Sequence, residues 1–523
     1  MDGSGSGKSA SYSIPNAYQM LGSYVFTDPK GELYDKTAGF LQRNGYDIKV
    51  LNLVRPQNSD GYNPLMHISS ELDVDVIANT IVKWQKTEGS NADPYWDDMA
   101  EMLLKALIYY LIATRPEEEQ NLASCAELVR AANTSGGSNL LSELINQLPY
   151  DHPARMYYKS IEIAPEKTYG SILSSLQSKL GKFDSKEIAE LTSTDTIDFE
   201  EIGKKKTAVY VISSDTHTAY DFLLTIFFAQ MIQQLYDFAD LNGGQLPMPT
   251  YFILDEFANI GKVPDFDKKI STSRSRKIQF SVILQNLDQL EAVYEKSYET
   301  IIGNCDTHVF LGSNSQKTVE YFSKALGEKT VSRDSISVNK DRQNWMQGKS
   351  VSDQINARAL LTPDELRRFD NDYCIIFEKG VRPIKAKKYY YFLKPEAKRL
   401  AEFTLNHNDA REIERGIWRK YNPYNPYIPE NEKQQTQNLK VESLDDLFEE
   451  EPQEKKTNKR EDAPVLPQEE ILEEAKPKQE EPKKRRDRFT KRARSKIWWA
   501  LWTNRRKLKN ITKVYLWWYF LWK

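Results

Sequence analysis

Short, nearly continuous apolar runs recur from residue 24 to residue 377 of this chain. They are rich in Val, Ile and Phe, which is typical of parallel strands that are buried on both faces. We expect these strands at residues 24–27, 48–53, 208–213, 251–254, 278–284, 308–312 and 373–377. A further edge strand is predicted at residues 389–392.

Helical periodicity separates the predicted strands. We expect helices at residues 8–20, 33–44, 219–238 and 395–404. Alternation of strands and helices is the signature of a sheet with helices on both of its faces. The predicted fold class is therefore α/β, with a doubly wound and mainly parallel sheet.

Residues 69–180 show helical periodicity alone, at residues 74–86, 95–114, 122–131 and 140–148. In the second of these segments, apolar side chains recur at positions i, i+3, i+4 and i+7 from Trp96 to Tyr110, as in a packed amphipathic helix. We therefore expect an all-α domain at residues 67–185. It divides the sheet-bearing region into residues 1–66 and residues 186–420.

The composition changes again at residue 421. Residues 421–487 are rich in Glu, Gln, Lys and Pro, so they bury too little apolar surface to offset the entropy of ordering, and we predict a disordered linker. Residues 488–523 form a basic tail with paired tryptophans. Residues 483–523 hold 15 Lys and Arg against one Asp, so the net charge of −3 divides into +14 there and −17 on residues 1–482.

The tail has three interpretations. Lys and Arg can neutralise DNA phosphates while Trp stacks on exposed bases. The same composition suits a helix in a membrane interface, which the tight tryptophan pairs beside aliphatic residues slightly favour. The third is a frayed terminus without a role.

Composition limits the class of protein. The chain of 523 residues has 40% apolar and 28% charged residues, as soluble globular proteins do. Its three cysteines lack metal-ligand spacing, which argues against a disulfide framework or a zinc site. The most apolar stretches, residues 102–113 and 222–229, are shorter than the about 20 residues that span a bilayer. We expect no signal peptide and no transmembrane helix in the chain as given.

A glycine-rich turn precedes the first predicted helix: Gly3-Ser4-Gly5-Ser6-Gly7-Lys8-Ser9. In a phosphate-binding loop of this kind the backbone N–H groups surround a polyphosphate, the Lys ammonium contacts the β and γ oxygens, and the Ser hydroxyl binds Mg²⁺. We therefore expect these seven residues to bind ATP. The alternative is a chance match, because Asp2 occupies the first glycine position and no strand precedes the loop.

Two carboxylates follow a predicted strand, Asp255 and Glu256 after residues 251–254. Nucleotides bind at this carboxyl-terminal edge of such sheets. We expect Asp255 to hold Mg²⁺ and Glu256 to orient and deprotonate the attacking water. A solvated turn is the alternative.

Three more polar residues are candidates for catalysis. Gln285 ends the strand predicted at residues 278–284, where its amide can contact the γ-phosphate or the water; the alternative is a strand cap. Arg274 and Arg276 lie between that strand and the carboxylates. They are candidates for an arginine finger that reaches a neighbouring subunit's phosphate, or they form a solvated basic turn.

The candidate residues Lys8 and Asp255 are 247 positions apart, which requires an inserted domain between them. Four stretches accompany them: Ser23-Tyr24-Val25-Phe26-Thr27-Asp28-Pro29-Lys30-Gly31-Glu32-Leu33, Asn52-Leu53 with Asp60-Gly61-Tyr62-Asn63-Pro64, Leu254-Asp255-Glu256-Phe257-Ala258-Asn259-Ile260-Gly261, and Ser273-Arg274-Ser275-Arg276. Together with the loop, they resemble the TraG/TraD-type coupling proteins of conjugative type IV secretion systems, from residue 3 to about residue 395.

The resemblance implies a RecA-like P-loop ATPase that uses ATP and Mg²⁺. Members of that family form hexamers at the cytoplasmic face of the bacterial cell membrane, where transmembrane helices anchor them. They recruit a relaxase bound to single-stranded DNA and deliver it to the subunits of the secretion channel. The all-α insert is then the domain that contacts this cargo.

The chain departs from the family in two respects, since it has neither the transmembrane helices nor a strand before the loop. We therefore expect Met1 to be an internal start of a longer, membrane-anchored protein. Two other functions remain open. One is a DNA translocase of the FtsK/HerA kind, and the other is a truncated cargo receptor that does not hydrolyse ATP.

Overall fold

The structure is a computed structural model of the chain, and it describes residues 7–83, 93–132, 139–214, 220–339 and 348–427. For residues 333–339 and 348–354 it describes the backbone alone. The predictions for Gly3–Ser6, for residues 428–487 and for the basic tail at residues 488–523 lie outside these ranges.

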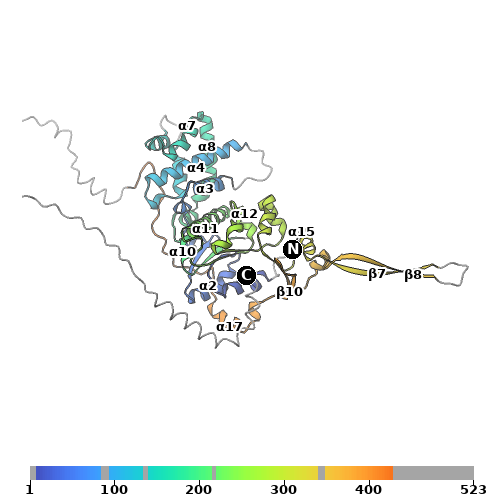
Figure 1. Cartoon of the computed structure of the whole chain (residues 1–523). Coiled ribbons are helices and arrows are strands. Elements are labelled where there is room, and N and C mark those ends of the chain that lie inside the picture. Colours follow the sequence, from blue (N-terminus) through green and yellow to red (C-terminus); the bar gives the residue numbers. More distant parts are fainter. Residues whose placement is uncertain (1–6, 84–92, 133–138, 215–219, 340–347, 428–523) are drawn as a thin grey trace, which may run out of the picture. The chain divides into compact units, whose positions relative to one another are not determined.

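A five-stranded parallel sheet forms the centre of the described region (Figure 1). The strand order is β2-β3-β1-β4-β5. The strands are β1 (Ser23–Thr27), β2 (Asp47–Asn52), β3 (Thr207–Ile212), β4 (Thr250–Leu254) and β5 (Ile278–Val282). Because Thr27 pairs with Leu254 and Leu254 pairs with Val282, the carboxyl ends of β1, β4 and β5 are level.

Helices cover both faces of this sheet, which confirms the doubly wound α/β class. Alternate residues of a strand point to opposite faces. Tyr24 and Phe26 of β1 belong to a buried cluster with α1 (Ile14–Ala17) and α2 (Glu32–Arg43), whereas Val25 belongs to a larger cluster with α11 (Asp221–Leu241). The helix predicted at residues 8–20 begins as a π-helical turn, η1 (Ser9–Ser13), before α1.

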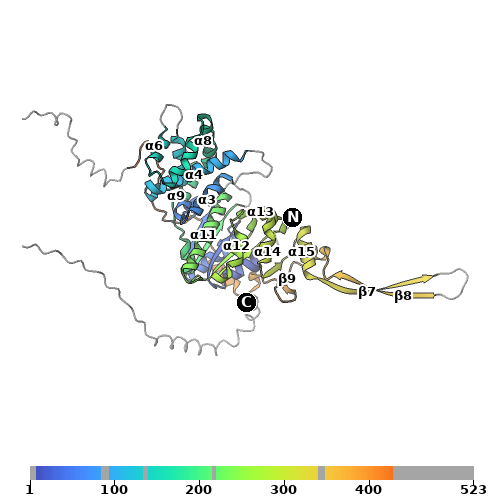
Figure 2. The ribbon, with the colours of Figure 1, turned by 45° about the horizontal axis from the view of Figure 1, so that its top comes forward.

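The helical stretch forms as expected, with more helices than the pattern showed. It contains α3 (Glu71–Lys83), α4 (Pro94–Thr114), α5 (Leu122–Ala131), α6 (Leu140–Asn146), α7 (Pro153–Glu162) and α8 (Glu166–Leu180). Two helices that were not predicted, α9 (Lys186–Ser193) and α10 (Phe199–Lys204), follow it before β3. Figure 2 shows α3, α4 and α8 beyond one end of α11. The domain boundaries at residues 66, 185 and 420 stay predictions.

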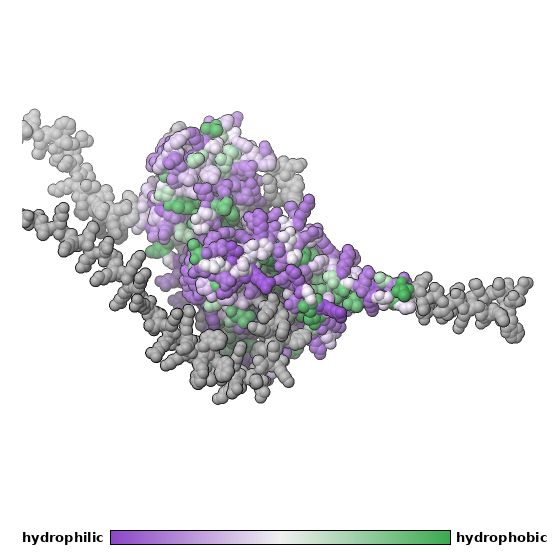
Figure 3. Space-filling view, viewed as in Figure 1, coloured by the Kyte–Doolittle hydropathy of each residue, from purple (hydrophilic) through white to green (hydrophobic). Residues whose placement is uncertain are grey.

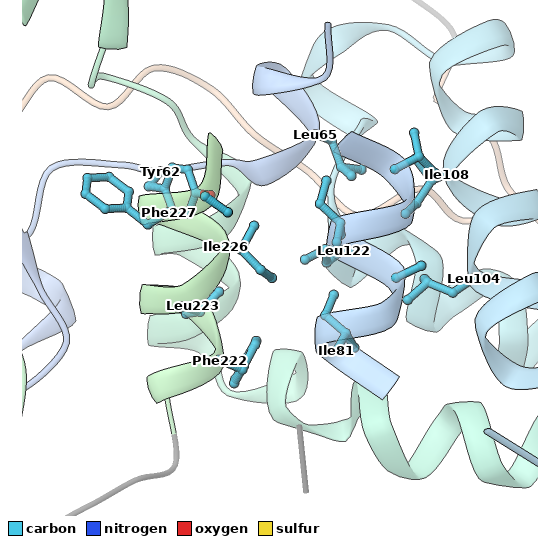
Figure 4. Close-up of a cluster of buried hydrophobic side chains, with 14 of the residues drawn as sticks. Tyr62, Leu65, Ile81, Leu104, Ile108, Leu122, Phe222, Leu223, Ile226 and Phe227 are labelled. Atoms are coloured by element: carbon cyan, nitrogen blue, oxygen red, sulfur yellow. The ribbon is translucent and has the colours of Figure 1, made fainter. Parts of the chain in front are cut away.

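One hydrophobic core joins the helical stretch to the sheet. In Figure 4, Phe222 and Ile226 of α11 lie on the side of that helix that faces Ile81 of α3. The same buried cluster contains Leu104 of α4 and Phe252 of β4. Apolar packing is therefore continuous from the central sheet to the helical stretch.

The strands after residue 300 differ from the prediction. β6 (Thr307–Phe310), β9 (Tyr373–Glu378) and β10 (Ile384–Lys387) form a separate antiparallel sheet in the order β10-β9-β6. The prediction that residues 308–312 and 373–377 continue the parallel sheet is therefore wrong. Their apolar runs reflect burial against α15 (Gln316–Leu326) and α16 (Pro363–Arg367), and burial does not specify the direction of pairing.

Two further differences follow β10. The edge strand predicted at residues 389–392 is wrong, because Tyr391–Leu393 form a 3₁₀ turn, η9. The helix predicted at residues 395–404 is confirmed as α17 (Ala397–Leu400) and the 3₁₀ turn η10 (Ala401–Phe403).

A hairpin of β7 (Glu328–Asn339) and β8 (Gly348–Ala359) extends beyond α15 in both ribbon views (Figures 1 and 2). No strand was predicted there, because its apolar residues are few and scattered.

On the face seen in Figure 3, the hydrophobic residues of the described part are dispersed among hydrophilic ones.

Within the described ranges, no helix combines the length and the apolar character that a membrane span needs.

Residues 404–427 run without helix or strand along the surface of the described region, and we call this segment the strap. It contacts α2 through Leu405 and His407, whose backbone N–H groups donate to the Asp35 carbonyl (2.9 Å) and carboxylate (2.6 Å). At its other end Tyr421 is 3% exposed, and its N–H donates to Ser124 Oγ of α5 at 2.9 Å. Tyr421, the first residue of the segment predicted to be disordered, is thus buried against α5, and the prediction of a disordered linker stays a prediction.

Candidate functional site

Three segments that are far apart in the sequence meet at the carboxyl edge of the parallel sheet. Lys8 Nζ lies 2.9 Å from Glu256 Oε1, and Gln285 Nε2 donates to the same oxygen at 3.0 Å. Ser9 Oγ donates to Asp255 Oδ2 at 3.2 Å. Five of the residues expected in an ATP site are thus in direct contact with one another.

Gly7 sets the path of the loop into the helix. Its φ of +74° is a left-handed value that a residue with a Cβ adopts at a cost. The carbonyl oxygen of Gly7 accepts hydrogen bonds from the N–H and the hydroxyl of Ser11, both at 2.7 Å. These bonds fix the end of the loop against the first helical turn, and the free N–H groups at the start of a helix are suited to bind an anion.

Tyr12 of the same turn connects the helix to the sheet through a hydrogen bond. Its hydroxyl is 2.8 Å from Ser281 Oγ of β5. Burial raises the pKa of the Tyr12 phenol, so it stays protonated near neutral pH. Lys8 is thereby held above the ends of β4 and β5.

The two carboxylates after β4 have different environments. Asp255 is 8% exposed, and its backbone carbonyl accepts a hydrogen bond of 2.6 Å from Thr27 Oγ1 of β1. Burial raises the pKa of Asp255, Lys8 opposes the rise, and Glu256 adds to it. A cation beside Asp255 therefore relieves an unfavourable buried charge.

Glu256 has a φ of +52°, again in the left-handed region. Such a conformation costs on the order of 1–3 kcal/mol in a non-glycine residue and is concentrated at functional sites. It turns the carboxylate toward Lys8 and Gln285 instead of continuing the direction of β4.

Asp28 is a third carboxylate at this edge, and sequence reasoning did not select it. It follows β1, is 2% exposed and accepts a hydrogen bond of 2.8 Å from the Tyr34 N–H of α2. Burial raises its pKa to about 7, and the negative charges of Asp35 and Asp255 add to the rise. The signal was an acidic residue directly after an apolar run that neighbours the strand of Asp255.

The structure does not bring Arg274 and Arg276 to this site. They form a 3₁₀ turn, η7 (Arg274–Arg276), before β5, at the opposite edge of the sheet from Glu256. Arg276 donates to both Asp240 oxygens at 2.9 Å. The Arg274 side chain is 79% exposed, and its guanidinium lies 3.4 Å from the Asp306 carboxylate.

The site suits a Mg²⁺-bound polyphosphate. Mg²⁺ is usually bound by one or two protein oxygens together with phosphate and water, and Ser9 and Asp255 supply such a pair. The described residues contain no group of three or more His, Cys, Asp or Glu side chains that could hold a metal by themselves.

The doubly wound sheet and the Lys8–Ser9 loop above its carboxylates define the chain as a protein of the P-loop NTPase fold. The family model for type IV secretory system conjugative DNA transfer matches residues 1–415. The chain therefore belongs to this family of coupling proteins in conjugative DNA transfer, as the resemblance implied.

Two curated relatives match about three quarters of this chain. The conjugal transfer protein TraG of Escherichia coli is 26% identical over 427 residues, which cover 75% of this chain and 66% of TraG. The protein VirD4 of Rhizobium radiobacter is 25% identical, over 76% of this chain and 57% of VirD4. The chain thus spans less than two thirds of the length of these relatives.

Solved structures share the fold. The unbound bacterial conjugative coupling protein TrwBdeltaN70 has a TM-score of 0.54 at 18% identity, over 73% of this chain and 82% of that one. The plasmid coupling protein TrwB in complex with the ATP analogue ADPNP also has a TM-score of 0.54, at 16% identity, over 74% of this chain and 83% of TrwB.

Proposed function

We propose that this protein hydrolyses ATP to recruit relaxase-bound single-stranded DNA and deliver it to a type IV secretion channel. The observation that carries the proposal is the direct contact among Lys8, Ser9, Asp255, Glu256 and Gln285. Membership of the conjugative DNA transfer family supports the process, and the nucleotide complex of the related TrwB supports ATP as the substrate.

Each residue has a role in the proposed reaction. The loop Gly3–Ser9 binds the phosphates and Lys8 contacts their oxygens. Ser9 with Asp255 would hold Mg²⁺, which would supply positive charge to neutralise the phosphates. Glu256 accepts the proton of the attacking water. Gln285 orients the Glu256 carboxylate through its 3.0 Å hydrogen bond.

The Lys8–Glu256 ion pair links binding to activation. Both side chains are largely buried, with 10% and 18% exposure. A polyphosphate competes with Glu256 for the Lys8 ammonium, so binding frees the carboxylate to accept a hydrogen bond from water. In this proposal Lys8 neutralises the Glu256 carboxylate until the phosphates of ATP take over the Lys8 ammonium.

Two variants of the full chain test this assignment. Lys8→Ala removes a phosphate contact, so we expect loss of ATP binding and of DNA-stimulated hydrolysis. Glu256→Gln removes the base but keeps the shape, so hydrolysis falls on the order of 100-fold or more while ATP still binds. Equilibrium titration with ATP and Mg²⁺ and a phosphate-release assay measure both.

The control is Lys268→Ala, because the Lys268 side chain is 78% exposed on α12 (Phe266–Thr272) and both activities should be unchanged. Hydrolysis that survives both site variants would overturn the ATPase assignment. Failure of the wild-type chain to bind ATP would favour the non-hydrolysing receptor.

The remaining parts of the proposal concern assembly. We propose a homo-hexamer that acts at the cytoplasmic face of the bacterial cell membrane and contacts the secretion channel subunits. Capture of a relaxase together with single-stranded DNA tests the coupling role. ATP-driven movement along DNA without relaxase capture would instead indicate a translocase of the FtsK/HerA kind.

A further inference from the structure

An aromatic segment lies against Gly7, where the described part of the phosphate-binding loop begins. Residues 389–393 are Tyr-Tyr-Tyr-Phe-Leu and follow β10. A Cβ placed on Gly7 would lie 2.6 Å from Cε1 and 3.2 Å from the hydroxyl of Tyr390. The ring of Tyr390 therefore covers Gly7 directly, although about 380 residues separate them in the sequence.

The described structure holds this segment in place. Lys388 is 7% exposed, and its Nζ donates to the Leu311 carbonyl and to Asn371 Oδ1, both at 2.8 Å. The Tyr390 hydroxyl donates to the Asn371 carbonyl at 3.2 Å. Both contacts fix the Tyr390 ring beside the loop before any ligand binds.

Phe392 extends the aromatic surface outward. Its ring centroid is 5.2 Å from that of Tyr390, with 30° between the planes. Phe392 is 54% exposed and Leu393 is 71% exposed. Tyr391 differs, because its ring centroid lies 6.3 Å from that of Tyr18, which follows α1, and it is partly buried against the hydrophobic cluster on that face of the sheet.

The half-buried Tyr390 ring and the exposed Phe392 ring, beside a phosphate site, offer a surface on which the base of a nucleotide can lie. If Lys8 binds the β and γ oxygens, the base and ribose extend from the other end of the phosphate chain, and the aromatic segment beside Gly7 is a surface that they could meet. Every nucleobase has a π-face, and stacking on an aromatic side chain stabilises it without reading its sequence. Large apolar side chains beside the rim reduce the water-exposed area of a bound base.

We propose that Tyr390 and Phe392 form the stacking surface for the base of the nucleotide whose phosphates the loop binds. This inference rests on the proposed ATPase function and names the part of the same site that recognises the base. Tyr390 contacts the base or ribose next to Gly7, and Phe392 covers the outer part of the base. Purines have a larger face than pyrimidines, so purine triphosphates should bind more tightly.

Binding of two ligands to the full chain tests the proposal. ATP carries a base, whereas inorganic tripolyphosphate offers the phosphates alone. For Tyr390→Ala and for Phe392→Ala we expect the affinity for ATP to fall about tenfold. The affinity for tripolyphosphate should stay within experimental error, and the preference for ATP over CTP should shrink.

Two more variants control for structural damage. Tyr390→Phe keeps the ring and removes the bond to Asn371, so it should retain most of the ATP affinity. Tyr424→Ala removes an exposed tyrosine whose hydroxyl contacts Ala131 of α5, and both affinities should be unchanged.

Equal loss of ATP and tripolyphosphate binding in Tyr390→Ala would overturn the proposal, because the ring would then only support the loop. Unchanged ATP binding in both alanine variants would overturn it as well. If Lys8→Ala binds ATP as tightly as the wild type, the ATPase assignment itself fails. The two failures are therefore distinguishable.

Discussion

Asp28 shows how one buried residue makes the stability of this protein depend on pH. Its carboxyl is enclosed at the end of β1 and has a pKa of about 7. An acid whose pKa is raised by folding binds a proton in the folded state at pH values where the unfolded chain has lost it. The free energy of unfolding therefore falls as the pH rises from about 4 to about 7, and this contribution is constant above that range.

Asp28→Asn should remove this dependence, because Asn resembles the protonated acid and its carbonyl oxygen can still accept from Tyr34. Relative to the wild type, the variant should gain up to about 1.4 kcal/mol in the free energy of unfolding per pH unit across this window. Urea unfolding at pH 5, 6, 7 and 8 measures the difference. Asp151→Asn, at an exposed position, should show none. A difference that is flat with pH for Asp28→Asn would contradict the assigned burial.

At the scale of elements, the strap connects parts that the sequence keeps apart. Arg411 donates to Asp60 at 3.0 Å in the loop after β2, and Arg419 donates to Glu119 at 3.2 Å before α5. Between them, the Arg415 side chain is 10% exposed and donates to the carbonyl oxygens of residues 56, 57 and 59. The strap thus satisfies backbone acceptors near β2 and pairs with carboxylates of the helical stretch.

Arg415→Ala should lower the free energy of unfolding by about 1–3 kcal/mol, because those carbonyl oxygens lose a charged donor. Arg415→Lys should recover little of it, since an ammonium cannot reproduce the planar fork of donors. Thermal or denaturant unfolding measures the change, with Arg399→Ala on the exposed surface of α17 as the control. Equal stability of Arg415→Ala and Arg399→Ala would show that the strap is not anchored there.

At the scale of the whole molecule, the two arginines at the far edge of the sheet differ in a way that bears on assembly. Arg276 is bound by Asp240 and lies over the Tyr236 ring at 4.8 Å, so it stabilises its own subunit. Arg274 is largely exposed at the edge opposite Glu256. In the hexamer that we propose, an exposed arginine at this edge could approach the nucleotide of a neighbouring subunit, so we propose Arg274 rather than Arg276 as the finger.

Arg274→Ala should therefore lower ATP hydrolysis by roughly a thousandfold with little change in ATP affinity. Mixing Arg274→Ala subunits with Glu256→Gln subunits should restore part of the activity, because some interfaces then combine an intact finger with an intact base. Arg276→Ala should reduce stability more than turnover. Absence of any recovery in the mixture would argue against action between subunits.

The sequence alone determined most of the central sheet, the helical stretch and the loop with its carboxylates. Apolar runs indicate buried strands, and helical spacing of apolar residues indicates a packed helix face. A carboxylate directly after a buried strand indicates the carboxyl-terminal edge of the parallel sheet. Each of these signals lies within a few neighbouring residues, so Lys8, Asp255, Glu256 and Gln285 could all be selected before the fold was known.

Tertiary structure decided the remainder. The antiparallel pairing of β6 with β9, the burial of Tyr421, the position of Arg274 at the far edge and the Tyr390 ring on Gly7 join residues that are far apart in the chain. No local pattern records such contacts, because they depend on which surfaces the folded elements leave available. Asp28 lies between the two cases: its position after a strand was visible, but its elevated pKa arises from the burial that only folding provides.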